Sequence, residues 1–175
     1  MASPAEQSET KKGEAELYAR LDQLKIQTHT VEHEPMFTVE DSIALRGNLS
    51  GGHCKSLFLK NKKGAFWLVV MLEDKRLDIR ALGDLLVSGR LSFCSPERLW
   101  HYLGVIPGSV TPFSVINDGN RSVNVVLDQD MMAFSPLHYH PLRNDKTTAI
   151  APVDLLAFLR AEGYEPQVLD LNFDQ

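Results

Sequence analysis

The strongest constraint on the fold of this chain is a pair of apolar segments joined by a short polar turn. Residues 55–59 and 66–72 are dominated by branched and aromatic side chains, and the segment 61–64, Asn-Lys-Lys-Gly, separates them. Apolar runs of this length that are bounded by turn residues are typical of β-strands. The sequence therefore predicts an antiparallel hairpin, which forms part of a larger sheet.

The rest of the chain mixes helical and strand patterns without a strict alternation. Leu17, Leu21 and Leu24 recur at helical spacing, and Thr38 with Asp41 three residues later indicates a helix cap. Such a mixture favours one α/β domain in which helices pack on a mixed sheet. Further helices are predicted at residues 38–47, 78–87, 96–103 and 152–162, and further strands at 28–31, 91–93, 113–116, 123–127, 133–139, 147–150 and 168–171.

A second hairpin is predicted in the middle of the chain. Residues 117–120, Asn-Asp-Gly-Asn, are a strong turn signal between the β-prone segments 113–116 and 123–127. The last predicted strand, 168–171, would close the sheet as an edge strand.

Length and charge narrow the classes of function. The chain has 175 residues, which suits one domain with a sizeable core. Its formal net charge of −5, from 18 basic and 23 acidic residues, argues against a protein that coats nucleic acid in general. A local basic patch remains compatible with this composition, because binding depends on where the charges gather.

The sequence indicates neither export nor membrane insertion. Two cysteines, Cys54 and Cys94, do not make a disulfide framework and fit a reducing compartment. The first residues lack the apolar core of a signal peptide, and the longest apolar run, 65–72, is too short to span a bilayer. We therefore expect a soluble cytoplasmic protein with a disordered arm at residues 1–13 and one folded domain at 14–175.

The segment 104–113, Gly-Val-Ile-Pro-Gly-Ser-Val-Thr-Pro-Phe, interrupts the regular patterns. Its two glycines and two prolines fit a rigid turn before a strand, which is the usual use of these residues. They also fit a loop that points backbone N–H groups at a ligand while the side chains stay aside. The residue types alone leave both interpretations open.

Thiol and imidazole groups suggest two kinds of chemistry, each with a simpler alternative. Cys54 beside His53 could be a nucleophile with its base, but neighbours on a strand point to opposite faces, and a cysteine there packs as a small apolar residue. His138 and His140 lie on one face of a predicted strand and could bind zinc, but no third ligand is evident.

Two further polar residues stand out. Lys55 opens an otherwise apolar strand, where it is either a solvated end residue or a cation aimed at a phosphate or hydroxyl oxygen. Asn144 lies in a polar loop, where it is either a turn residue or a group that donates and accepts hydrogen bonds at a substrate.

Taken together, these residues resemble the YbaK/ProX family, the free-standing relatives of the editing domain inserted in bacterial prolyl-tRNA synthetases. The likeness covers about residues 14–173. Three segments carry it: Cys54-Lys-Ser-Leu-Phe-Leu59 with Lys55 at the position of the family's lysine, Gly108-Ser-Val-Thr-Pro112, which fits the family's Gly-x-x-x-Pro loop, and Asn144-Asp-Lys-Thr-Thr148, which is similar to its late Asn/Thr segment. The order of the three is specific, although each alone is weak.

The resemblance implies a single α/β domain around a mixed, partly barrel-like sheet, with a pocket between the lysine strand and the Gly/Pro loop. Within the family the chain is most similar to ProX-type proteins, which deacylate alanine mischarged onto proline tRNA. The implied reaction is water attack on the aminoacyl ester without a covalent enzyme intermediate, and it needs neither a cofactor nor a metal. The implied partners are the acceptor end of tRNA(Pro) and prolyl-tRNA synthetase, with no role for DNA or a membrane.

The resemblance also suggests roles for individual residues. Lys55, Gly108 and Asn144 are the implied catalytic residues: Lys55 would hold the terminal phosphate or ribose, and backbone N–H groups at Gly108 would stabilise the oxyanion. The implied substrate-binding residues are Ser109, Val110, Thr111, Pro112, His138, His140 and Thr147. The candidates for contact with the acceptor stem are Lys60, Arg76, Arg80 and Arg143.

Three other functions remain open from the sequence. One is a deacylase of the same family for Ser- or Cys-charged tRNA, which pocket volume would distinguish. Another is a non-catalytic protein that binds tRNA or a synthetase, against which the presence of Lys55 and Gly108 argues. The third is a small-ligand-binding module with no RNA partner.

Overall fold

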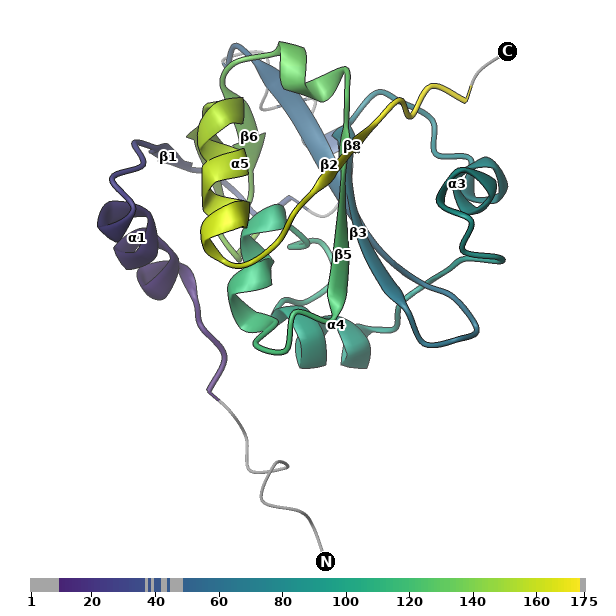
Figure 1. Cartoon of the computed structure of the whole chain (residues 1–175). Coiled ribbons are helices and arrows are strands. Elements are labelled where there is room, and N and C mark those ends of the chain that lie inside the picture. Colours follow the sequence, from purple (N-terminus) through teal and green to yellow (C-terminus); the bar gives the residue numbers. More distant parts are fainter. Residues whose placement is uncertain (1–9, 37, 39, 42–43, 45–48, 174–175) are drawn as a thin grey trace, which may run out of the picture.

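A mixed β-sheet forms the centre of the molecule in the computed structural model, which describes residues 10–36, 38, 40–41, 44 and 49–173 (Figure 1). Its strand order is β1-β7-β6-β2-β3-β5-β8, and β4 pairs with β2. The pairs β2–β6, β3–β5 and β5–β8 are parallel and the others antiparallel, so the predicted mixed sheet is confirmed. The strands are β1 (His29–Glu32), β2 (Gly52–Lys60), β3 (Phe66–Leu72), β4 (Ser92–Phe93), β5 (Val123–Asp128), β6 (Leu137–Tyr139), β7 (Lys146–Ile150) and β8 (Gln167–Leu169).

The predicted hairpin is confirmed as β2 and β3, which pair from Cys54 with Leu72 to Lys60 with Phe66. The side chain of Asn61 holds the turn, because its oxygen accepts the N–H groups of Lys63 at 3.1 Å and Ala65 at 2.9 Å. This is the local bonding that makes asparagine a frequent turn residue.

Helices cover both faces of the sheet: α1 (Glu14–Gln23), α3 (Ile79–Leu86), α4 (Pro96–Leu103) and α5 (Pro152–Ala161). Figure 1 shows α3 on one side of the sheet and α4 and α5 on the other. Ser95 caps α4, with Pro96 in its first turn and Gly104 at its end with a φ of 64°. Within the described part of the chain, none of the helices is long and apolar enough to cross a membrane.

Two apolar clusters fill the space between the sheet and these helices. The larger one includes Phe58 and Leu68 from the sheet together with Leu103 of α4 and Phe158 of α5. The smaller one lies on the opposite face, where Leu82 of α3 packs with the sheet residues Leu59, Trp67, Val69, Met71 and Val126. Because successive strand residues point to opposite faces, the alternation along β2 and β3 separates the two clusters.

The predicted strand at 113–116 is wrong, and so is the second hairpin. Residues 112–117 form a 3₁₀-helix, η2 (Pro112–Asn117), whose first turn is capped by the hydroxyl of Thr111 accepting the Phe113 N–H at 3.3 Å. Proline after a hydroxyl residue favours a helix start, because it fixes φ and its missing N–H is not needed there. The turn signal at 117–120 therefore connects a helix to β5.

The predicted strand at 133–139 is shorter than expected. Only 137–139 pair as β6, and the preceding 3₁₀-helix η3 (Met131–Ala133) and the cis Ser135–Pro136 bond occupy the rest.

The N-terminal predictions are tested only in part. The cap at Thr38 is confirmed, since its hydroxyl accepts the Asp41 N–H at 3.1 Å and the Asp41 carboxylate accepts the Thr38 N–H at 3.3 Å. Most of the predicted helix 38–47 lies outside the described residues, as does the arm up to residue 9. Lys11 and Lys12 bond to His101 and Asn117, and the boundary between arm and domain stays a prediction.

Candidate active site

One face of the sheet gathers polar side chains from β2, β6 and β7. His53 and Lys55 lie on the same face of β2, and His138 of β6 pairs in register with His53. The two imidazole rings stack with centroids 4.8 Å apart. His140 follows His138 by two residues, and the register of β6 with β7 places Thr147 on this face. The structure thus brings together four of the predicted site residues: Lys55, His138, His140 and Thr147.

His33, just after β1, completes this polar face. Its Nε2 lies 2.7 Å from the hydroxyl oxygen of Thr147, and its ring centroid is 6.5 Å from that of His140. We use the name polar face for His33, His53, Lys55, His138, His140 and Thr147. Neither His33 nor His53 is among the site residues expected from the sequence, although His33 continues the alternation of the strand before it.

The side chain of Lys55, in β2, reaches the turn that follows the neighbouring strand β3. Its ammonium group donates a hydrogen bond to the carbonyl oxygen of Lys75 in the turn that follows this strand. Burial lowers the pKa of Lys55, while the carboxylates of Glu73 and Asp74 act in the opposite direction. Lys55 is thus a partly buried, anchored cation, not a solvated residue at a strand end.

Glu73 links Lys55 to the histidines electrostatically. It is buried at 6% exposure, and its backbone N–H donates to the His53 carbonyl oxygen at 2.9 Å. The charge of Glu73 acts on the pKa of both Lys55 and His140. A carboxylate that is buried in this way is costly unless it is compensated, so its place beside Lys55 is significant.

Backbone carbonyl groups fix the proton positions on the imidazoles. His140 Nδ1 lies 3.0 Å from the Lys146 carbonyl oxygen, and His138 Nε2 lies 2.6 Å from that of Ser50. A carbonyl oxygen only accepts, so these two nitrogens carry the protons. His140 Nε2 and His138 Nδ1 are then left with lone pairs that can accept a hydrogen bond.

Both of these histidines are neutral at pH 7. Burial lowers the pKa of His138 and of His140 below the ordinary value of 6.5. For His140 the nearby His33 adds to this effect, while the Lys146 carbonyl, Glu73 and Asp145 oppose it. Neutral imidazoles suit hydrogen bonding to a substrate or a water molecule.

The two thiols are poor nucleophiles. Burial raises the pKa of Cys54 to about 12 and that of Cys94 to about 11. Since the thiolate is the reactive form, neither group is activated near pH 7. Cys54 packs against the larger apolar cluster, as the simpler interpretation of the sequence expects. Among the described residues, no group of three or more His, Cys, Asp or Glu side chains could hold a metal ion.

The Gly108–Pro112 segment connects α4 to η2, and much of it is buried. Ser109 is 1% exposed and Thr111 is fully buried. The Ser109 N–H donates to the Ile106 carbonyl oxygen at 3.0 Å, so it is not free for an oxyanion. Gly108 is exposed with a φ of 90°. Within the described residues neither Gly108 nor Val110 uses its N–H in a hydrogen bond, so these two remain candidate donors.

The other predicted residues are distributed over several places. Asn144 lies in the loop before β7, where its amide nitrogen donates to the Met36 carbonyl oxygen at 3.2 Å. Arg143 forms ion pairs with Glu14 at 2.9 Å and Asp145 at 2.5 Å. The other three candidates for tRNA contact lie at opposite ends of the β2–β3 hairpin. Arg76 and Arg80 come after the end of β3, and Lys60 lies at the turn between the two strands.

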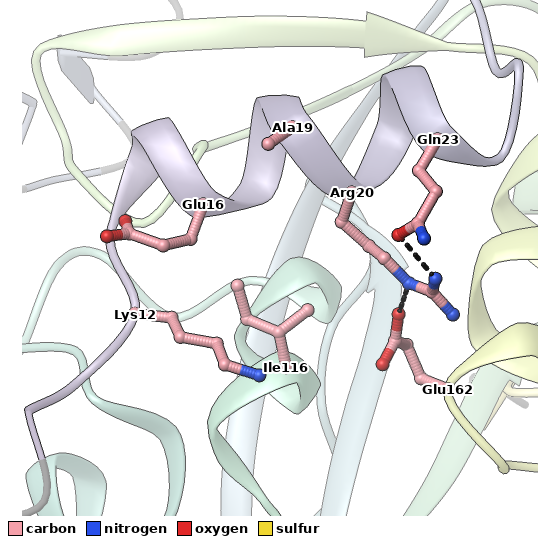
Figure 2. A pocket seen from close by; sticks show the side chains of 7 residues that line it. All are labelled: Lys12, Glu16, Ala19, Arg20, Gln23, Ile116 and Glu162. Carbon is pink, nitrogen blue, oxygen red and sulfur yellow. Dashed lines mark hydrogen bonds and ion pairs between the residues drawn. The ribbon is translucent and has the colours of Figure 1, made fainter.

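A separate hollow of about 540 Å³ lies between α1, η2 and the end of α5 (Figure 2). An ion pair between Arg20 and Glu162, with Nε and Oε1 2.5 Å apart, crosses one side of it. None of the predicted site residues lines this hollow, which is bounded by Lys12, Glu16, Ala19, Arg20, Gln23, Ile116 and Glu162.

Comparison with known proteins adds independent information. A family model described as the aminoacyl-tRNA editing domain matches residues 33–158. The chain is 38% identical over 165 residues to prolyl-tRNA synthetase associated domain-containing protein 1 of Mus musculus, covering 91% of this chain and 96% of that protein. It is 35% identical over 154 residues to the prolyl-tRNA editing protein ProX of Acetoanaerobium sticklandii, covering 87% and 94%.

The fold is also similar to that of solved structures. A crystal structure described as that of a candidate trans-editing enzyme for prolyl-tRNA synthetase superposes with a TM-score of 0.70. The sequences are 20% identical, and the match covers 99% of this chain and all of the other. The architecture of sheet and helices is thus shared.

Proposed function

The chain belongs to the YbaK/ProX family of aminoacyl-tRNA editing domains, and on that premise we propose that it hydrolyses Ala-tRNA(Pro) in trans to alanine and free tRNA. The observation that carries the proposal is the polar face, on which Lys55 lies with His138, His140 and Thr147. The name of the 35% identical relative, a prolyl-tRNA editing protein, supports the choice of tRNA.

Alanine is a chemically reasonable target. It is smaller than proline, so a prolyl-tRNA synthetase pocket excludes it only by lost contacts, which are worth a few kcal/mol. A second site that admits alanine and rejects proline by steric clash supplies the missing discrimination.

We also propose that the protein acts in the cytoplasm, where the tRNA is charged, and that prolyl-tRNA synthetase is a partner. The name of the mouse relative supports this partner.

In the proposed reaction a water oxygen bonds to the ester carbonyl carbon, the bond from this carbon to the ribose oxygen breaks, and the ribose oxygen takes the proton that the water releases. Lys55 would bind the terminal phosphate or ribose of the tRNA. The lone pair on His140 Nε2 would accept a hydrogen bond from the water or from the amino group of alanine. We assign the role of donor to the developing oxyanion to the Gly108 N–H on the family resemblance alone.

A covalent enzyme intermediate is not part of this mechanism. With pKa values of about 12 for Cys54 and about 11 for Cys94, the thiols stay protonated. Asn144 and Thr147 are assigned to substrate positioning, and the Thr147 hydroxyl oxygen lies 2.7 Å from His33 Nε2.

The decisive experiment is deacylation of purified Ala-tRNA(Pro), with Pro-tRNA(Pro), Ala-tRNA(Ala), Ser-tRNA(Pro) and Cys-tRNA(Pro) as comparisons. Rapid hydrolysis of Ala-tRNA(Pro) alone is the expected result. Hydrolysis of the Ser or Cys substrate in its place would identify the alternative deacylase. If no substrate is hydrolysed while uncharged tRNA(Pro) binds, the protein is a binding module and the proposal is wrong.

We expect the rate of Ala-tRNA(Pro) hydrolysis to fall in acid with an apparent pKa below 6.5. His140 must be neutral to accept a hydrogen bond, and burial holds its pKa below 6.5. The free energy of unfolding should fall over the same window, because below pH 6.5 the unfolded chain binds protons that the folded protein resists. Single-turnover rates and urea unfolding from pH 5 to pH 8 test this. An acid limb centred above pH 6.5 would contradict the assignment.

A further inference from the structure

An unusual concentration of positive charge lies at the far end of β2 from Lys55. The β2–β3 turn, the loop before β4 and the first turn of α4 contribute five basic residues, which we call the hairpin-end surface: Lys60, Lys62, Lys63, Arg90 and Arg98. Over the segments 60–65 and 88–98 that supply them, Glu97 is the one carboxylate, on a chain whose formal net charge is −5.

Several contacts bring these segments together. β4 pairs with the end of β2, so that Ser92 lies opposite Lys60 and Phe93 opposite Leu59. The amide nitrogen of Asn61 in the hairpin turn donates to the Ser88 carbonyl oxygen at 3.0 Å. The start of α4 is close as well, because the Cys94 thiol, one residue before its cap, is within electrostatic reach of both Lys60 and Arg98. In Figure 1 the β2–β3 turn and α4 lie at the same end of the molecule.

In the part of the chain that the structure describes, no ion pair neutralises the positive charge of this surface. Basic residues elsewhere, such as Lys75, Arg143 and Lys146, form ion pairs with nearby carboxylates. Among the described residues, none of the five members of the hairpin-end surface makes such a pair. Clustered cations repel one another, so their arrangement favours an anionic partner with several charges.

β4, which pairs with the Lys60 end of β2, also carries an exposed aromatic side chain. Phe93 is 54% exposed, and its position opposite Leu59 puts it on the same face of the sheet as Lys55. Basic residues next to an exposed aromatic ring are the combination by which proteins bind RNA, with cations on phosphates and the ring stacked on an unpaired base. Lipid headgroups and acidic protein surfaces would use the cations but have no base to stack on this ring.

We propose that the hairpin-end surface binds the phosphate backbone of the tRNA acceptor arm while the aminoacylated 3′ end occupies the polar face. This extends the proposed function by a second contact region on the same substrate. Lys60 lies five positions after Lys55 along β2, a span of about 17 Å at about 3.4 Å per residue. Lys60 points to the opposite face of the sheet from Lys55, so an acceptor arm whose end lies at Lys55 would meet this surface at the hairpin turn, through Lys62 and Lys63.

The test compares two variants that remove the same charge from different places. Lys62→Gln/Lys63→Gln alters the hairpin-end surface, and Lys25→Gln/Arg160→Gln alters exposed residues outside it. Binding of uncharged tRNA(Pro) is measured at several salt concentrations, so that the result does not depend on hydrolysis. We expect the first variant to bind roughly tenfold more weakly at low salt, with its slope of log K against log salt reduced by about two. The control should match the wild type.

Several outcomes would overturn the inference. One is an unchanged affinity and salt slope in Lys62→Gln/Lys63→Gln, with thermal unfolding confirming that both variants are folded. Another is equal binding to phosphatidylserine vesicles or polyglutamate, lost equally in this variant, which would show an unspecific anion surface. The proposed hydrolysis fails separately: a wild type that binds tRNA through this surface but deacylates nothing refutes the enzyme and leaves the surface standing.

Discussion

Replacing Lys55 by alanine is expected to lower kcat/KM for Ala-tRNA(Pro) hydrolysis by about 100-fold or more, because one preorganised donor to developing or fixed negative charge is worth about 3 kcal/mol. The ammonium group is partly buried and bonded to the Lys75 carbonyl oxygen, so it is already positioned before the substrate arrives. A fixed cation loses less conformational entropy on binding than a mobile surface lysine. Initial rates at low substrate concentration measure the effect.

Two further variants separate charge from geometry. Lys55→Arg keeps the charge but changes the shape of the donor, and we expect it to recover only part of the activity. Lys25→Ala removes a cation that is exposed and outside the site, and it should hydrolyse at the wild-type rate. Full activity of Lys55→Ala, with a normal unfolding transition, would remove this lysine from the proposed mechanism.

Much of the fold could be predicted because its signals are local. The apolar runs on either side of Asn61 specified the β2–β3 hairpin, and Ser95-Pro96 specified the start of α4. The strand order could not be predicted from such local signals, since β2 pairs with β6 across about eighty residues of chain. Nothing in the local sequence specifies such a pairing, which depends on the packing of the whole sheet.

In the segment 111–116 two local signals favour different structures. Phe113, Val115 and Ile116 are β-prone residues next to a strong turn signal, which favoured a strand. Thr111 and Pro112 were equally clear signals for a helical turn, and the structure follows them. An apolar segment that is buried throughout has no polar face, so its periodicity does not distinguish a strand from a short helix.

The candidate site was predictable in its strand residues and less so in its supporting residues. Lys55, His138 and His140 stand out because polar side chains interrupt apolar strands. His33 and Glu73 come from neighbouring elements, and their proximity to these residues depends on the strand pairing. Their inclusion therefore required the three-dimensional structure.

Asp128 supports the turn that binds Lys55, and replacing it is expected to have the second large effect. This carboxylate at the end of β5 is fully buried, and it accepts hydrogen bonds from the Leu72 N–H at 3.1 Å and from Lys75 Nζ at 2.7 Å. It also accepts the Asp130 N–H at 3.1 Å. Asp128 thus holds the turn whose Lys75 carbonyl oxygen receives Lys55, which makes it a positioning residue for the candidate site.

We expect Asp128→Ala to lower the free energy of unfolding by about 3 kcal/mol, since it leaves the partly buried Leu72 N–H without its partner and a largely buried ammonium with one partner fewer. Asp130→Asn is the matched control, because Asp130 pairs with the same Lys75 Nζ at 2.9 Å but is 48% exposed. It should cost less than about 1 kcal/mol. Urea unfolding measures both, and equal destabilisation by the two substitutions would contradict the role given to Asp128. In the folded fraction of Asp128→Ala, kcat/KM should also fall, because the released turn no longer fixes the Lys55 ammonium.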